Sequence, residues 1–208
     1  HGKKKKSFET FTAPFMEEEL AKEVTIPFGQ YQERIKGIMD KHGFVIVTGL
    51  LNKAEQTAAE GILYQDLLES VDTEKITDKG IKKVIQDISA NKLHWPRSSI
   101  PGLVKKGFLS YFGFPQGRFA WTLRTNPKAK EIYQFLHGEE DIIVGLDMPF
   151  FNPDDTPSDS VELWPHADQN IHLKKGCENS YQGILYVWDS TQPNTSNTIV
   201  WPGSWNSQ

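Results

Sequence analysis

The stretch GILYVWDSTQPNTSNTIVWPGSW, residues 183–205, decides which fold the sequence predicts. Two apolar runs within it, GILYVWDS at 183–190 and TIVWPGS at 198–204, are rich in the β-branched and aromatic residues that favour strands. The polar segment QPNTSN between them consists of residue types that favour turns. We therefore expect two strands joined by a loop in this part of the chain.

Two more strand-like stretches lie upstream, FVIVTGL at residues 44–50 and DIIVGLDMPFF at residues 141–151. The other patterned segments that precede residue 137 have helical spacing, whereas strand patterns dominate after residue 140. This order of helices first and strands second predicts α+β packing rather than alternating βαβ units.

Apolar residues at helical spacing predict three long helices, at residues 29–41, 52–71 and 127–136. Asn52 and Glu55 form a capping-box pattern at the start of the second helix. We expect the buried face of that helix to consist of Ala58, Ile62, Leu63, Leu67 and Val71. A shorter helix is predicted at residues 81–88, and an irregular connection rich in Pro, Gly and aromatic residues at 93–121.

The stretch LWPHADQNIHL, residues 163–173, carries the residue types of a metal site. In an extended segment, side chains two positions apart point to the same face, so His166 and Asp168 would converge on one point. Together with a distant second histidine, such a pair forms the facial triad of non-haem Fe(II) oxygenases. One His-x-Asp triplet is by itself a weak signal, because chance supplies it in many chains of this length.

Several stretches, taken in order, resemble the phytanoyl-CoA dioxygenase-like family of Fe(II)/2-oxoglutarate-dependent oxygenases. HGFVIVTGLL resembles the early strand of that family, which a long helix follows, and IIVGLDMPFFNP resembles the strand that leads into the metal loop. WPHADQN resembles the metal motif, and residues 183–205 are similar to the strand, turn and strand after it. The similarity runs from about residue 42 to residue 205 and is strongest from residue 142 onward.

The resemblance implies a double-stranded β-helix, a jelly-roll or cupin-like core of two facing sheets, with N-terminal helices that buttress one side. We expect this α+β domain at residues 28–208, after an N-terminal tail and lead-in at residues 1–27. The resemblance also implies a dioxygenase that uses Fe(II), O₂ and the co-substrate 2-oxoglutarate. Such an enzyme decarboxylates 2-oxoglutarate to succinate and CO₂ and oxidises an unactivated C–H bond of a small-molecule substrate.

The resemblance also implies roles for individual residues. His166 and Asp168 match the first two iron ligands by position. Trp188 stands where the family has a residue that lines the 2-oxoglutarate site, and Met148 falls near another such position. Arg124 is a separate candidate, because a guanidinium could bind a carboxylate of 2-oxoglutarate or of an acidic substrate. The alternative for Arg124 is a structural or surface role.

The family also has a third iron ligand, a histidine well downstream of the metal motif, and soon after it an arginine that binds 2-oxoglutarate. No histidine follows His172 and no arginine follows Arg124 in this sequence. We therefore expect both residues, and the C-terminal strands that complete the barrel, beyond Gln208. His172 itself is a less favoured third ligand, because a residue six positions along a strand lies about 20 Å away. The other histidines (His42, His94, His137) are expected outside the site.

Two alternative functions remain to be compared with the dioxygenase prediction, and the composition bears on the first. The net charge of −4 and the isoelectric point near 5.9 argue against a nucleic-acid-modifying oxygenase, since phosphate binding favours a basic surface. An inactive barrel that binds a ligand or a partner is a second alternative, because the third ligand is missing. The single cysteine, Cys177, indicates a reducing compartment, cytoplasmic or nuclear, and no apolar run is long enough to span a membrane. The sequence does not indicate an oligomeric state.

Overall fold

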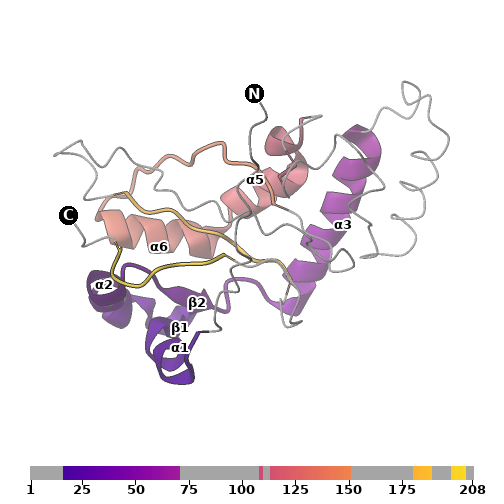
Figure 1. Ribbon diagram of the computed structural model, residues 1–208. Coiled ribbons are helices and arrows are strands. Elements are labelled where there is room, and N and C mark those ends of the chain that lie inside the picture. Colours follow the sequence, from indigo (N-terminus) through magenta and orange to yellow (C-terminus); the bar gives the residue numbers. More distant parts are fainter. Residues whose placement is uncertain (1–15, 71–107, 110–112, 151–179, 189–197, 205–208) are drawn as a thin grey trace, which may run out of the picture.

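The computed structural model describes residues 16–70, 108–109, 113–150, 180–188 and 198–204, which are coloured in Figure 1. Its elements in chain order are α1 (Glu18–Val24), β1 (Thr25–Pro27), η1 (Phe28–Gln30), α2 (Tyr31–His42), β2 (Ile46–Thr48), α3 (Lys53–Ser70), η3 (Phe114–Gln116), α5 (Arg118–Arg124) and α6 (Pro127–His137). The described part of the chain is thus mostly helical. None of its helices is long and apolar enough to cross a membrane.

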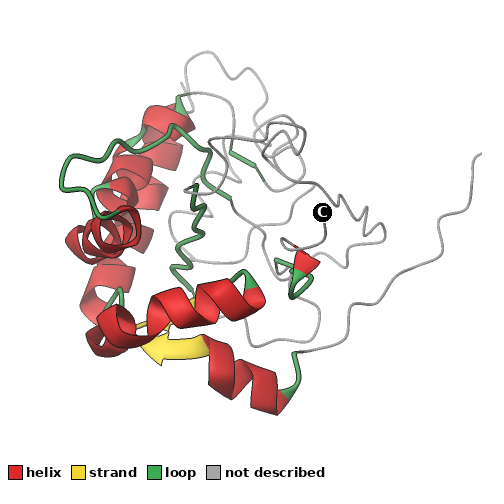
Figure 2. Ribbon diagram, turned by 90° about the vertical axis from the view of Figure 1, so that its left-hand side faces the viewer, coloured by secondary structure: helices red, strands yellow, loops and turns green. Residues whose placement is uncertain are grey.

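The strands β1 and β2 form a parallel pair, in which Thr25 faces Ile46 and Pro27 faces Thr48. The connection between them runs through α2, so that this region is a single βαβ unit (Figure 2). Helix α2 ends at Gly43, whose positive φ of 77° closes the helix in the left-handed conformation that glycine adopts without strain. The predicted strand at residues 44–50 is confirmed over its central three residues. Strand β1 was not predicted, because three residues are too few to show alternation.

The hydrophobic core of this unit lies around α2. Ile35 and Ile38, which belong to the predicted apolar face of the helix at residues 29–41, are both buried there. Ile132 of α6 packs into the same cluster, and the Tyr31 hydroxyl donates a 2.7 Å hydrogen bond to Glu131 Oε1 of α6. Helix α2 therefore joins the small sheet to α6. The cluster comprises Val24, Ile26, Tyr31, Ile35, Ile38 and Ile132.

Helix α3 begins with the predicted capping box. The Asn52 amide donates to Glu55 Oε2 at 2.7 Å, and the Glu55 amide donates to Asn52 Oδ1 at 2.9 Å. The predicted buried face was only partly right, because Leu63 is buried but Ala58 is exposed. The buried residues are Ala59, Leu63, Tyr64 and Asp66. The buried face of α3 is thus rotated by about one residue from the predicted face. The cause is that α3 packs on α5, a helix that the sequence pattern did not reveal.

Helix α6 follows the sequence prediction closely. The Asn126 Oδ1 atom accepts a 3.0 Å hydrogen bond from the Ala129 amide, and Pro127 occupies the first helical position. Gly138, with φ of 70°, terminates the helix. The prediction of an irregular connection up to residue 121 was wrong at its end, where α5 is a helix. Only seven residues long, α5 shows too little periodicity to be recognised.

The predicted C-terminal strands are not confirmed: their described residues, 141–150, 183–188 and 198–204, do not form strands, apart from a single bridge. Phe150 forms an isolated antiparallel bridge with Phe108, and the Tyr186 hydroxyl lies 2.7 Å from Thr198 Oγ1, which links the segments at 180–188 and 198–204. Figure 1 shows these segments running along the α6 side of the molecule. Among the described residues β1 and β2 form the whole of the sheet structure, so the double-stranded β-helix stays a prediction. The predicted helix at residues 81–88 lies outside the described residues.

Replacing Asn52 with Ala should lower the free energy of unfolding by about 1 kcal/mol, because the first turn of α3 loses a side-chain acceptor for the Glu55 amide. Urea denaturation followed by circular dichroism measures the change. Gln65→Ala, at an exposed position of the same helix, is the control and should leave the urea midpoint unchanged. An Asn52→Ala variant as stable as the wild type would contradict the role of the capping box.

Glu23 of α1 lies beside Lys41 and His42, which belong to the last turn of α2. Its Oε1 atom pairs with Lys41 Nζ and lies 3.1 Å from His42 Nε2. The hydrogen bonds from Lys41 and then from His42 hold the pKa of the Glu23 carboxyl below its ordinary value of 4.5. Since the folded pKa lies below the unfolded one, the contacts stabilise the fold above pH 4.5, and this contribution is lost as the pH falls through the folded pKa.

Glu23→Gln should therefore reduce the stability that the protein loses on acidification. We expect a smaller difference between the urea midpoints at about pH 6 and about pH 3 than in the wild type. Glu33→Gln, which changes an exposed glutamate of α2, is the control and should retain the wild-type difference. Equal differences in all three proteins would show that the Glu23 contacts do not contribute.

Candidate functional site

The predicted site residues fall into two groups. His166 and Asp168, the predicted iron ligands, lie outside the described residues, as do His94 and His172. Trp188, Met148 and Arg124, the predicted co-substrate residues, are described. Helix α5 contains Arg124 and contacts the segments that carry Trp188 and Met148.

A buried carboxylate sets the position of α5. Asp66 of α3 is 5% exposed, and its Oδ2 atom accepts a 2.7 Å hydrogen bond from the Phe119 amide. Its Oδ1 atom accepts a 3.0 Å hydrogen bond from Arg118 Nε. Both donors belong to the first turn of α5, where backbone amides lack partners within the helix and negative charge is favourable. Asp66 thus caps a helix that lies far from it in sequence.

Gly117 makes this close approach possible. A Cβ atom at position 117 would lie 2.5 Å from Asp66 Oδ2, closer than such contacts occur. The Arg118 guanidinium also pairs with Glu69 of α3 at 2.8 Å. The hydrogen bonds to Asp66 and then to Glu69 raise the pKa of Arg118 above its ordinary value. Helices α3 and α5 are therefore joined by a charged contact in which Asp66 is buried, whereas Arg118 and Glu69 are exposed.

The N-terminal half of α5 contacts Trp188. The Phe119 ring is buried and lies almost parallel to the Trp188 indole, with 6.4 Å between ring centroids and 19° between planes. This geometry is a favourable offset stack. Val187, the preceding residue, is also buried. Two consecutive side chains, those of Val187 and Trp188, therefore pack against the rest of the protein. Trp188 is therefore held by packing rather than extended into solvent.

The C-terminal end of α5 contacts the segment that carries Met148. Arg124 donates from Nη1 to the Pro115 carbonyl at 2.5 Å and from Nη2 to the Asp147 carbonyl. Its guanidinium also lies over the Trp121 ring, 5.3 Å from the centroid. A ligand-binding role for Arg124 would have to share the guanidinium with these two carbonyls. Met148, which follows Asp147, is 45% exposed.

Helix α6 contributes Tyr133 to the same region. A Cβ atom at Gly183 would lie 2.1 Å from the Tyr133 hydroxyl oxygen, so the hydroxyl approaches the backbone of the 180–188 segment as only glycine allows. Burial, and then the negative charge of Asp147, raise the pKa of Tyr133. Tyr133 thus remains a neutral hydroxyl between the segments that carry Met148 and Trp188.

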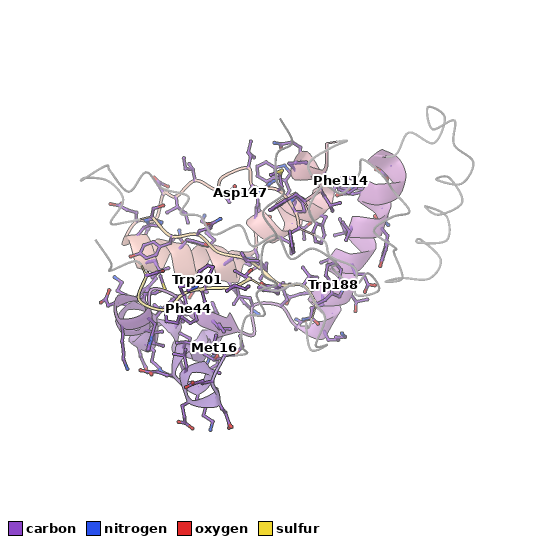
Figure 3. The ribbon with its side chains drawn as sticks, in the orientation of Figure 1. Met16, Phe44, Phe114, Asp147, Trp188 and Trp201 are labelled. Carbon is purple, nitrogen blue, oxygen red and sulfur yellow. The ribbon has the colours of Figure 1, made fainter. Side chains whose placement is uncertain are left out.

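Helix α5 therefore contacts or contains each of the three described candidate residues or their neighbours, Trp188, Met148 and Arg124. Phe119 stacks on Trp188, and Arg124 donates to the carbonyl of the residue before Met148, so that one short helix contacts both segments that carry predicted co-substrate residues. Figure 3 labels Asp147 and Trp188, which are well separated in that view. Sequence reasoning missed Asp66 and Phe119. The sequence Gly117-Arg118-Phe119 offers a local signal only for the glycine, because the acceptor of the helix cap comes from another element.

Within the described ranges no three His, Cys, Asp or Glu side chains are grouped as a metal site requires. His42 lies beside Glu23 at the end of α2, and His137 ends α6 with its ring 5.1 Å from that of Tyr181. The donor set predicted for iron, one imidazole and one carboxylate, has the chemistry that Fe(II) prefers.

No family model, curated protein or solved structure matches the chain. The resemblance based on the ordered motifs therefore stays a prediction.

Asp66→Ala should lower the free energy of unfolding by about 2 kcal/mol, because the Phe119 amide and the Arg118 guanidinium lose a charged acceptor. Urea denaturation again measures the loss. The matched control is Glu69→Ala, which removes the exposed partner of the same arginine and should cost less than about 0.5 kcal/mol. Equal losses in the two variants would show that burial of the Asp66 contact does not matter.

Proposed function

We propose that the protein is an Fe(II)- and 2-oxoglutarate-dependent dioxygenase that oxidises an unactivated C–H bond of a small-molecule substrate. The observation that carries the proposal is the order of the motifs along the chain, with His166 and Asp168 at the centre of WPHADQN. The contacts of α5 with Trp188 and with the Asp147 carbonyl support it, because they join the two segments in which co-substrate residues are predicted.

In this proposal His166 and Asp168 are two ligands of the iron. The bound ion supplies the chemistry by which O₂ and 2-oxoglutarate give succinate, CO₂ and an oxidised substrate carbon. Trp188 and Met148 line the co-substrate site, which excludes water and fixes the orientation of 2-oxoglutarate. The Arg124 guanidinium adds positive charge near the Asp147 carbonyl, which favours a dianionic ligand such as 2-oxoglutarate.

Succinate formation tests the proposal. The full-length protein, supplied with Fe(II), O₂ and 2-oxoglutarate, should form succinate, and a chelator should abolish the reaction. Loss of one iron ligand should greatly weaken metal binding. His166→Ala and Asp168→Ala should therefore each lower the rate of succinate formation by more than about 100-fold. His172→Ala is the matched control within the same segment, and we expect it to retain most of the rate.

Metal dependence separates this proposal from its alternatives. An inactive barrel would form no succinate with any metal, even where 2-oxoglutarate binds. A nucleic-acid oxygenase would form succinate, and oligonucleotides at moderate salt would both bind and stimulate it. A rate equal to that of the wild type in both ligand variants would contradict the assignment of His166 and Asp168.

A further inference from the structure

We infer that Phe119 is a positioning residue that sets the orientation of the Trp188 indole, and that Asp66 fixes Phe119 in turn. Neither Asp66 nor Phe119 belongs to a sequence motif, and their roles follow from the contacts that they make. It rests on the proposed function in one respect, namely that Trp188 lines the site of a dicarboxylate co-substrate.

Asp66 holds the backbone of Phe119 through a hydrogen bond. The amide of Phe119 donates a 2.7 Å hydrogen bond to Asp66 Oδ2, and this bond is buried. Asp66 is almost fully buried, so its carboxylate needs this donor and the Arg118 guanidinium to offset the loss of water. The position of the Phe119 backbone is therefore tied to α3 and not only to its own short helix.

The second step joins the backbone of Phe119 to its ring. The side chain is 5% exposed and lies at the interface of α5 with neighbouring elements. A closely packed ring occupies one rotamer, because the others would displace its neighbours. The plane of the Phe119 ring thus follows from the position of its backbone.

The third step joins the two rings. With 19° between planes and 6.4 Å between centroids, the Phe119 ring is a nearly parallel, laterally displaced neighbour of the Trp188 indole. Buried Val187 restricts the backbone of the same segment. A ligand that packs on Trp188 therefore meets an indole whose tilt is set by Phe119, and a tilted indole would bind a dicarboxylate less tightly.

Fluorine NMR of protein labelled with 5-fluorotryptophan tests this chain of contacts. The six tryptophans give separate resonances, and Trp188→Phe identifies the one that belongs to residue 188. Phe119→Leu should shift or broaden the Trp188 resonance, whereas Phe119→Tyr keeps the ring and should restore it. Phe28→Leu is the matched control, because it removes a ring from a similar stacked pair, Phe28 with Tyr31, that does not include Trp188.

Binding is measured on the same samples. Titration of 2-oxoglutarate in the presence of Mn²⁺ and the absence of O₂ should shift the Trp188 resonance, and Phe119→Leu should raise the Kd about 5-fold. Asp66→Asn provides a second variant that leaves both rings in place, and we expect it to change the Trp188 resonance in the same direction. Thermal unfolding of each variant confirms that the folded protein is compared.

The outcomes separate the inference from the proposed function. An unchanged Trp188 resonance in Phe119→Leu overturns the inference, and so does an unchanged Kd when the wild type binds 2-oxoglutarate. A wild-type protein that does not bind 2-oxoglutarate overturns the proposed function, and the Trp188 resonance of Asp66→Asn, in which both rings are present, then decides whether the contact through Phe119 positions Trp188. A shifted resonance together with weaker binding supports both.

Discussion

The position of helix α5 depends on one buried carboxylate. Asp66 leaves water when α3 packs against α5, and its charge is stabilised only because Phe119 and Arg118 present donors at the start of α5. Gly117 has no side chain to block this approach. The contact decides where α5 lies, and α5 in turn places one aromatic ring beside Trp188 and one guanidinium beside the Asp147 carbonyl. A helix of seven residues, too short to be stable alone, thereby becomes the support of two predicted co-substrate segments.

Helices α2, α3 and α6 could be predicted because their signals are local, whereas α1 lies within residues 1–27, which were expected to be a tail and lead-in. Asn52 with Glu55, and Asn126 with Gly138, mark helix ends through hydrogen bonds and backbone conformations within a few residues. Ile35 and Ile38 repeat at the spacing of one helix face and do pack in the core. The exact buried face of α3 could not be read in this way, since it depends on α5, and α5 itself carries no long repeat. Strand β1 is likewise visible only through its pairing with β2.

The residues of the candidate site also differ in whether local sequence signals could predict them. His166 and Asp168 were predicted from two neighbouring positions and from the order of motifs, which requires no knowledge of distant contacts. Asp66 and Phe119 could not be predicted, because their roles arise from a contact between α3 and α5 and from a stack with a residue in another segment. Arg124 was predicted as a cation near the co-substrate, and the structure adds that it also donates to two backbone carbonyls. The predicted double-stranded β-helix depends on long-range strand pairing, which local patterns suggest but do not determine.

The central claim is that His166 and Asp168 bind one ferrous ion beside the co-substrate segments that α5 supports. A crystal structure of the full-length protein, grown without O₂ in the presence of Fe(II) and 2-oxoglutarate, tests this claim most directly. The account predicts anomalous density for iron within bonding distance of both side chains, with 2-oxoglutarate on the same ion and against Trp188. Two side chains that point apart, or iron bound elsewhere, would contradict it.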